Sequence, residues 1–240
     1  VLYKRPDYRE AYTSLLNQLE RQLRDDGWHA TSTLSEAPTW GGGSWMSYTS
    51  ALFGLRIDSH PEYLSMIDRY QSDSYPDLGH YLKTQGYEYV RLSSLSDEME
   101  EEDWLRYKNF YGVDRWLQYG DLDYHGPHYG WGPSPPDQYA LHFAHQTIVS
   151  ASDRPVFLFT ITQNSHYPWV PLPEVADDWR TLNQETNKEA VPVPDPIPHE
   201  VRRKNYLKAI DYELGFLTDF IRYPDEDGVI FVLSNTTDFT

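Results

Sequence analysis

The sequence predicts an α/β fold, a three-layer sandwich around a mostly parallel central sheet that is incomplete at both ends. Two segments, PVFLFTIT at 155–162 and GVIFVL at 228–233, are continuous apolar runs, as in parallel strands buried on both faces. Stretches with helical periodicity separate the predicted strands, which favours crossover connections. The length of 240 residues suits one such domain over 1–240.

The first half of the chain predicts helices alternating with strands. Over 7–24 the residues Tyr8, Tyr12, Leu15, Leu19 and Leu23 recur at helical spacing, so this segment is expected to form a helix that ends at 25–27. The elements expected next are a short strand at 29–34, a glycine-rich loop at 38–44, a helix at 45–53, a helix at 78–85 and a buried strand at 87–95.

The second half continues the pattern. The acidic run 97–103 indicates a solvated helix start, and the Gly- and Pro-rich segment 120–136 indicates a long structured loop. The remaining elements expected are a helix at 137–150, the strand at 155–162, a Pro-rich surface excursion at 167–199, a helix at 200–222 and the strand at 228–233.

Composition excludes several classes of function. The net charge of −17 argues against nucleic-acid binding and disfavours adsorption to anionic lipid. The absence of cysteine excludes disulfides, zinc–thiolate sites and cysteine nucleophiles. No run of 18 apolar residues occurs. The chain starts at Val1 and reads as part of a longer polypeptide.

Ser44 is the first candidate for chemistry. Three glycines precede it, and glycine lets the backbone approach a bound anion closely. The helix that follows would direct free N–H groups at the same place, where a hydroxyl could attack a phosphorus or sulfur centre. The alternative is that Ser44 merely caps the helix, as serine often does. The segment is not a P-loop, because no Lys-Ser/Thr follows the glycines.

The segment around Ser44 reads APTWGGGSWMSYTSALFGL over 37–55, with Ser44 ten residues before Gly54. It resembles the nucleophile segment of sulfatase-like proteins of the alkaline phosphatase superfamily, in particular the bacterial membrane-anchored group that includes lipoteichoic acid synthase-like proteins. Further matches follow in order: VLYKRPDYREAYTSLLNQLE at 1–20, FYGVDR at 110–115, GPHYGWGPSPPDQYAL at 126–141, NSHYPWVPLP at 164–173 and NYLKAIDYELGFLTDFI at 205–221.

The resemblance implies roles for particular residues. Ser44 stands at the position of the nucleophile and metal ligand, with Gly43 and Trp45 beside it on the substrate side. His166 stands where the family has a histidine near the phosphate or sulfate. An active member would need a divalent metal (Mn, Mg, Zn or Ca) and an anionic ester substrate. The resemblance also implies the periplasmic or extracytoplasmic face of a bacterial inner membrane, with an anchor outside this chain.

The chain departs from the family at the metal site. The family's Asp-His ligand pair should follow residue 233, where this chain has Asn235 and Thr236. Asparagine is a neutral, weaker oxygen ligand and threonine a poor one, and Asp238 lies three residues too late. The ligand set, with Ser44 and Asn235 as its candidates, is therefore incomplete.

Two pairs of histidines are further candidate ligands. The pairs His142 with His145 and His125 with His128 have spacings that could share a metal, but neither pair has an identified third ligand. The aromatic residues Tyr124, Tyr129 and Trp131 are expected to pack under the long loop, which would border the site.

Two functions follow. In the first, the chain is a degenerate sulfatase-like domain that serves as an extracytoplasmic interaction or structural subunit, for example in a membrane-protein complex. In the second, it is a metal-dependent hydrolase or phosphotransferase acting on phosphate or sulfate esters, with Ser44 as nucleophile and His166 on the anionic oxygens. Function resides in the site, so the fold does not decide between them.

Overall fold

The computed structural model describes residues 6–33, 36–39, 43–73, 75–96, 99–184, 197–222, 228–230 and 232. Two compact units divide the chain, Val1–Leu78 with Ile221–Thr240 as the first and Gly79–Phe220 as the second. Each unit is described by itself.

The first unit is helical in its described part. Helix α1 spans Pro6–Asp25, α2 spans Ser44–Phe53 and α3 spans His60–Tyr70. The predicted helix at 7–24 is confirmed, and Tyr8 and Leu23 of its apolar stripe are buried. The chain leaves α1 through Gly27, whose φ of 93° is a left-handed conformation that glycine adopts without strain. The ion pair between Arg222 and Asp26, at 2.6 Å, joins the two sequence-distant parts of this unit.

The strand predicted at 29–34 is wrong for its described residues, because positions 29–33 belong to no strand. The segment is short and polar, so it has no apolar face to bury. The sequence reading also missed α3, which starts with Ser59 accepting a hydrogen bond from the Glu62 N–H at 3.3 Å. Tyr63 and Ile67 are the buried residues of this helix.

The second unit is built on a small parallel sheet. Strands β1 (Glu88–Leu92), β2 (Arg115–Leu117) and β3 (Val156–Thr160) lie in the order β2-β1-β3, and both pairings are parallel. Every residue of the central strand β1 is buried. The mostly parallel sheet is therefore confirmed, with β2 as a strand that the sequence reading did not separate from its surroundings.

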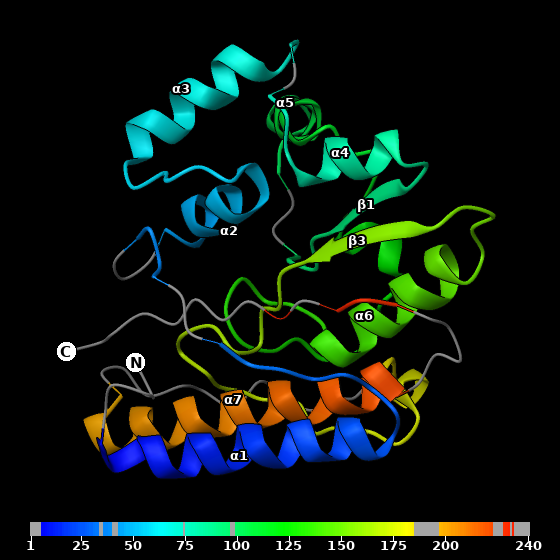
Figure 1. Ribbon diagram of the computed structural model, residues 1–240. Coiled ribbons are helices and arrows are strands. Elements are labelled where there is room, and N and C mark those ends of the chain that lie inside the picture. Colours follow the sequence, from blue (N-terminus) through cyan, green and yellow to red (C-terminus); the bar gives the residue numbers. More distant parts are fainter. Residues whose placement is uncertain are drawn as a thin grey trace. The chain divides into compact units, whose positions relative to one another are not determined.

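Helices lie on both faces of this sheet (Figure 1). On one face are α4 (Leu78–Thr84) and α5 (Glu101–Tyr111), and Arg91 of β1 points to that side, where its guanidinium contacts Tyr111. On the other face lies α6 (Asp137–Ala144), whose Tyr139 and Ala140 share a core cluster with Leu92. The three-layer sandwich is confirmed within this unit.

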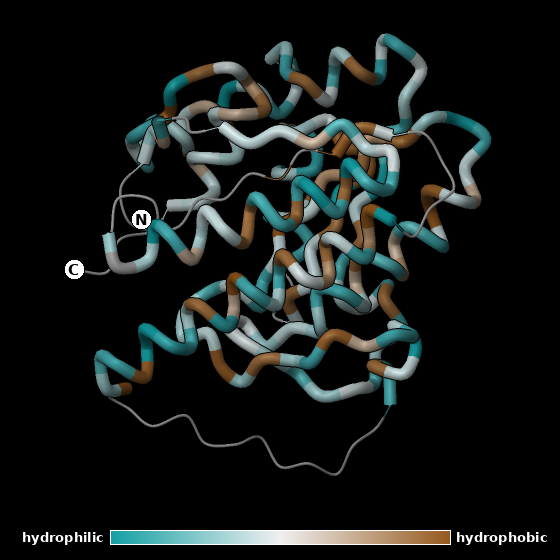
Figure 2. The backbone as a smooth tube through the Cα atoms, turned by 60° about the horizontal axis from the view of Figure 1, so that its bottom comes forward, coloured by the Kyte–Doolittle hydropathy of each residue, from teal (hydrophilic) through white to brown (hydrophobic). Residues whose placement is uncertain are grey.

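Helix α7 (His199–Arg222) adds a second helix on the α6 side. Its residues Tyr212, Phe216 and Phe220 pack on Leu141 of α6. The predicted helix is confirmed. Of its predicted aliphatic stripe Ile221 is buried, whereas Leu207, Ile210, Leu214 and Leu217 are only partly buried. In Figure 2, brown hydrophobic and teal hydrophilic segments alternate along the coiled parts of the tube, as expected for helices with one buried face.

The remaining elements are short. Helix α6 continues as a π-type turn at His145–Val149, and two 3₁₀ helices lie at Tyr119–Leu122 and Trp179–Leu182. Within the Pro-rich segment 167–199 the structure describes residues 167–184 and 197–199, and both Trp169 and Trp179 are buried.

The strand predicted at 228–233 is wrong for its described residues. Positions 228–230 and 232 belong to no strand, and Val229 is 80% exposed. An apolar run becomes a buried strand only when a neighbouring strand pairs its backbone, and periodicity does not reveal that pairing. Across the described part of the chain, no helix is long and apolar enough to span a bilayer.

Candidate functional site

The loop after β3 is the most densely hydrogen-bonded candidate site discussed for the second unit. Residues 163–166, here called the β3 turn, follow the carboxyl end of an inner-layer parallel strand, the edge where α/β sheets commonly bind ligands. Both oxygens of the Asp137 carboxylate accept a hydrogen bond from the Gln163 N–H at 2.9 Å, and Oδ2 also accepts from the Asn164 N–H at 2.6 Å. In return, the Asp137 N–H donates to Oδ1 of Asn164 at 2.8 Å.

Asn164 also holds the long loop that precedes α6. Its Nδ2 donates to the Ser134 hydroxyl and to the Pro135 carbonyl, each at 3.3 Å. The Gly130 N–H donates to the Pro171 carbonyl at 3.2 Å, and a Cβ on Gly130 would lie 3.3 Å from the Gln163 carbonyl oxygen. The long loop and the β3 turn are therefore packed against each other with little room to spare.

His166 is presented by this turn at the surface. Its N–H donates to the Gln163 carbonyl at 3.0 Å, and its ring is stacked on Trp131 with centroids 4.6 Å apart. Its Nδ1 lies 2.8 Å from the Tyr167 carbonyl oxygen. A carbonyl only accepts, so Nδ1 carries the hydrogen and the neutral ring keeps Nε2 as an acceptor. His166, Trp131 and Tyr167 are all exposed and are called the aromatic face.

Ser44 has the local geometry of a helix start in the first unit. Gly43 occupies the N-cap position in a left-handed conformation with φ 68°, and no side chain caps α2. The capping role weighed for Ser44 is therefore wrong, because Ser44 is the first helical residue. Its side chain is exposed beside the free N–H groups of the first turn. Ser47, one turn further on, ties α2 to the preceding loop through the Thr39 hydroxyl at 2.6 Å.

Trp45 has a structural partner. Its Nε1 donates to Nδ1 of His60 at 3.2 Å, and the two rings meet edge to face, which fastens α2 to α3. Ser44 and Trp45 belong to the first unit and His166 to the second, so each candidate is placed within its own unit. The roles of Gly43, Ser44, Trp45 and His166 in catalysis or substrate binding stay predictions.

The metal candidates are only partly covered. Asn235, Thr236 and Asp238 lie outside the described residues. Within the described part of the chain, no group of three or more His, Asp or Glu side chains could hold a metal ion. These residues therefore do not fit a divalent metal by themselves, and no chemical step is assigned to one.

Three histidines of the two candidate pairs contact aromatic rings or a hydroxyl group. His142 is buried and stacked on Trp179, and His145 meets Phe220 edge to face. Burial, with His145 and Arg180 nearby, lowers the pKa of His142 to about 4. His128 contacts the Tyr119 hydroxyl at 2.8 Å.

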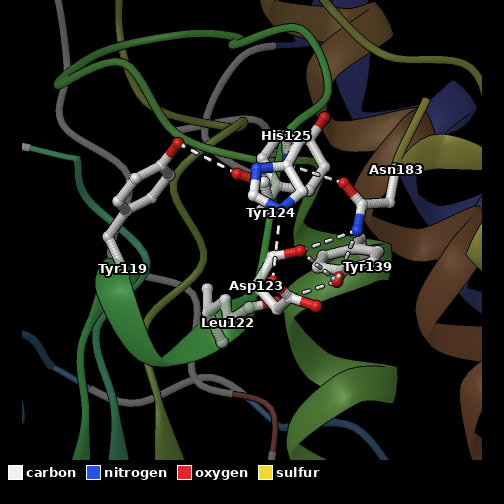
Figure 3. A network of polar contacts seen from close by, with 7 residues as sticks. All are labelled: Tyr119, Leu122, Asp123, Tyr124, His125, Tyr139 and Asn183. Atoms are coloured by element: carbon white, nitrogen blue, oxygen red, sulfur yellow. Dashed lines mark hydrogen bonds and ion pairs between the residues drawn. The ribbon is translucent and has the colours of Figure 1, made fainter. Parts of the chain in front are cut away.

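The segment around His125 belongs to a polar network that shapes the long loop (Figure 3). Asn183 accepts from the His125 N–H at 2.6 Å and donates to the Asp123 carbonyl at 2.7 Å, while the Tyr139 hydroxyl donates to the Leu122 carbonyl at 2.8 Å. Burial, with Asp123 adding to it, raises the pKa of Tyr139 to about 12, so this phenol stays a donor at neutral pH. The network closes the loop, and the exposed His125 and Asp123 side chains contact each other at 3.1 Å on its surface.

The expected packing of aromatic residues under the loop holds for one of them and fails for another. Tyr124 is 5% exposed and donates its hydroxyl to the Pro127 carbonyl at 2.7 Å. Trp131 is 48% exposed and stacks on His166 instead. The sequence reading missed Trp131 as a site residue and missed Asp137 and Asn164 entirely. The available signals were an Asp directly after Pro135-Pro136 and an Asn directly after the strand.

These features define an α/β domain with a small parallel sheet and a candidate site at the carboxyl end of that sheet. No family model matches the chain, and no curated protein sequence matches it. Among solved structures, the fold is similar to the crystal structure of the lipoteichoic acid synthase LtaP from Listeria monocytogenes, with a TM-score of 0.56 over 85% of this chain and 15% sequence identity. The chain spans 45% of that protein's chain. At this identity the likeness establishes the fold.

Proposed function

We propose that the chain is a degenerate sulfatase-like domain that serves as an extracytoplasmic interaction subunit and engages its partner through the aromatic face. The observation that carries the proposal is the stacking of Trp131 on His166 at the end of β3. Trp131 is 48% exposed and Tyr167 is 37% exposed, although both side chains are largely apolar. Aromatic side chains of this kind dominate the energetics of protein interfaces.

The aromatic face is also held in place before any partner arrives. The β3 turn is fastened to the start of α6 by the Asp137 and Asn164 hydrogen bonds. A rigid surface loses less conformational entropy on binding than a mobile one, so this arrangement favours recognition. The residues at the expected metal-ligand positions support an interaction function over catalysis. Asn235 and Thr236 stand where the resemblance implies an Asp-His pair. The extracytoplasmic location rests on the same resemblance.

The proposal is tested by site-specific photo-crosslinking in membranes of the source cells. A photoreactive phenylalanine replaces Trp131 or Tyr167, and the matched control places it at Tyr81, an exposed aromatic residue of α4 that is 60% exposed. We expect one discrete adduct from positions 131 and 167 and none from position 81. The same adducts from all three positions, or none from any, would show that the aromatic face is not the interface.

One observation favours a second function, a phosphate- or sulfate-ester hydrolase. Ser44 is exposed as the first residue of α2 behind the left-handed Gly43, so its hydroxyl lies at a positive helix end. The test is turnover of aryl phosphate and aryl sulfate esters with Mn²⁺, Mg²⁺, Zn²⁺ or Ca²⁺ supplied singly, comparing Ser44→Ala with Ser47→Ala. Turnover that is lost in Ser44→Ala but kept in Ser47→Ala would overturn the interaction-subunit proposal. Stoichiometric metal in the purified protein would add support to the hydrolase function.

A further inference from the structure

Two carboxyl groups are buried together between α6 and α7. Asp137, the first residue of α6, is 4% exposed, and Glu213, in the middle of α7, is 6% exposed. Burying an isolated charge in a protein interior is strongly unfavourable, so a buried carboxyl group must be paired, hydrogen-bonded or protonated. The two groups meet these requirements in different ways.

Asp137 is surrounded by hydrogen-bond donors. Its two oxygens accept from the backbone N–H groups of Gln163 and Asn164 at 2.6–2.9 Å. Backbone donors stabilise the ionised carboxylate, so this side chain is the natural place for the negative charge of the pair.

Glu213 has the opposite surroundings. Neither of its oxygens accepts a hydrogen bond of good geometry from a described residue. The polar groups beside it are the Asp137 side chain and Ser165. Two carboxyl groups buried side by side cannot both be ionised, and only Asp137 receives backbone N–H donors, so the proton of the pair belongs on Glu213. Burial raises the pKa of Glu213 well above its ordinary value, and Asp137 raises it further, against a smaller opposing effect of Ser165.

The other polar side chains near the pair, those of Tyr212, Tyr129 and Ser165, carry no positive charge that would balance its negative charge. Tyr212 lies beside Glu213 on α7 and accepts from the Gln138 N–H at 3.4 Å. Burial raises the pKa of Tyr212, and Asp137 and Glu213 raise it further, so this phenol is uncharged at neutral pH. Tyr129, on the long loop, acts on Tyr212 in the same direction, and Ser165 belongs to the β3 turn.

We propose that Asp137 and Glu213 share one proton at neutral pH and that this carboxyl pair is the positioning device of the β3 turn. The protonated Glu213 donates to Asp137, and Asp137 holds the Gln163 and Asn164 N–H groups. The turn held in this way carries His166 and its stack with Trp131. This proposal holds whether the chain is an interaction subunit or a hydrolase, because it rests only on groups inside the second unit.

The first test is infrared spectroscopy of the full chain at pH 7. A protonated buried carboxylic acid has a carbonyl stretch distinct from the carboxylate bands. We expect this band in the wild type, its loss in Glu213→Gln and its retention in Glu200→Gln, a change at an exposed glutamate of the same helix. Absence of the band from the folded wild type overturns the proposal whether or not any variant folds.

The second test is the pH dependence of unfolding. An unfolded glutamate loses its proton above a pKa of about 4.5, whereas native Glu213 keeps its proton, so rising pH favours the unfolded state. Glutamine donates the same hydrogen bond without titrating. The folded-to-unfolded ratio of Glu213→Gln relative to wild type should therefore rise with pH, by up to about tenfold per pH unit. Parallel pH curves for the two proteins contradict the proposal.

The third test separates positioning from general stability. In ¹H–¹⁵N spectra at pH 7, Asp137→Asn should shift the Gln163 and Asn164 amide signals and the His166 ring signals, because one oxygen acceptor is lost. Glu213→Gln should leave these signals in place. If Glu213→Gln moves them as far as Asp137→Asn does, or if Asp137→Asn leaves them unmoved, the pair is not what positions the turn.

Discussion

The guanidinium carbon of Arg91 lies 4.3 Å from the ring centroid of Trp116, and the same group lies 4.4 Å from the ring of Tyr111. Phe159 of β3 adds a third ring at 5.3 Å. Arg91 is 3% exposed at the middle of β1, a position at which an apolar side chain is usual. A flat guanidinium can stack between aromatic rings, which explains how this cation fits between the sheet and α5.

The stacking predicts that Arg91→Lys destabilises the fold. Lysine keeps the charge but has a compact, strongly hydrated ammonium that cannot stack, so the free energy of unfolding should fall by ~1–3 kcal/mol. Urea denaturation measures the change. The matched control is Arg69→Lys, where an exposed arginine lies 5.3 Å from the ring of Tyr70. Equal effects at the two positions would contradict the stacking argument.

Gly112 and His80 give a prediction about backbone and packing together. Gly112 ends α5 at φ 63°, and a Cβ there would overlap the His80 ring, whereas Gly86, at φ 91°, has no atom within 4 Å of that position. Gly86→Ala should cost ~1–2 kcal/mol for the left-handed backbone, and Gly112→Ala should cost more because of the overlap. Thermal unfolding checks the order. In the His80→Ala background the excess should disappear, and its persistence would contradict this explanation.

Ser50 and Ser44 are expected to differ in stability effects although both belong to α2. The Ser50 hydroxyl accepts from the Ile57 N–H at 3.0 Å, and Ile57 is fully buried. Ser50→Ala leaves that N–H without its acceptor and should lower the free energy of unfolding by ~1–3 kcal/mol. Ser44→Ala, at an exposed site, should change it by less than about 0.5 kcal/mol. A large loss of stability in Ser44→Ala would mean that the glycine-rich segment has a structural role.

His142 predicts acid sensitivity. Its pKa is lowered from 6.5 to about 4, so between these values the unfolded state binds more protons than the native state. Stability should therefore be lost as pH falls from 6.5 towards 4, with a slope of up to about 1.4 kcal/mol per pH unit. His142→Phe should remove this contribution to the slope, and His199→Phe, at an exposed site, should not. The outcome that would count against the prediction is an unchanged slope in His142→Phe.

The sequence predicts correctly those elements whose structure depends on the pattern within a single segment. Three such local patterns are the period of α1 and α7, the apolar run of β3, and Gly43 before α2. The structure confirms the elements that they predict. The failures are elements that depend on partners. Val229 and Val232 have strand-like neighbours in sequence but no strand in the described part of the chain, because pairing decides strands.

The candidate site was harder to foresee for the same reason. Ser44 and His166 were found through motifs, but Asp137 and Asn164 bond to each other across 27 positions of sequence. Glu213 is a charged residue beside the aliphatic stripe of α7, and charged residues are seldom fully buried. A glutamate one position from Tyr212 reads as an ordinary surface residue until the packing of α6 on α7 is known.

The positions of the strands in the sequence also determine how long β1 lacks one partner during synthesis. Glu88 of the central strand pairs with Val156, about seventy residues later in the chain. At 5–20 residues per second, a ribosome needs roughly 3–14 s to deliver β3 after β1 has been made. Throughout that interval one edge of the central strand β1 has no partner. Shortening the segment between β1 and β3 would shorten the time for which this edge is exposed.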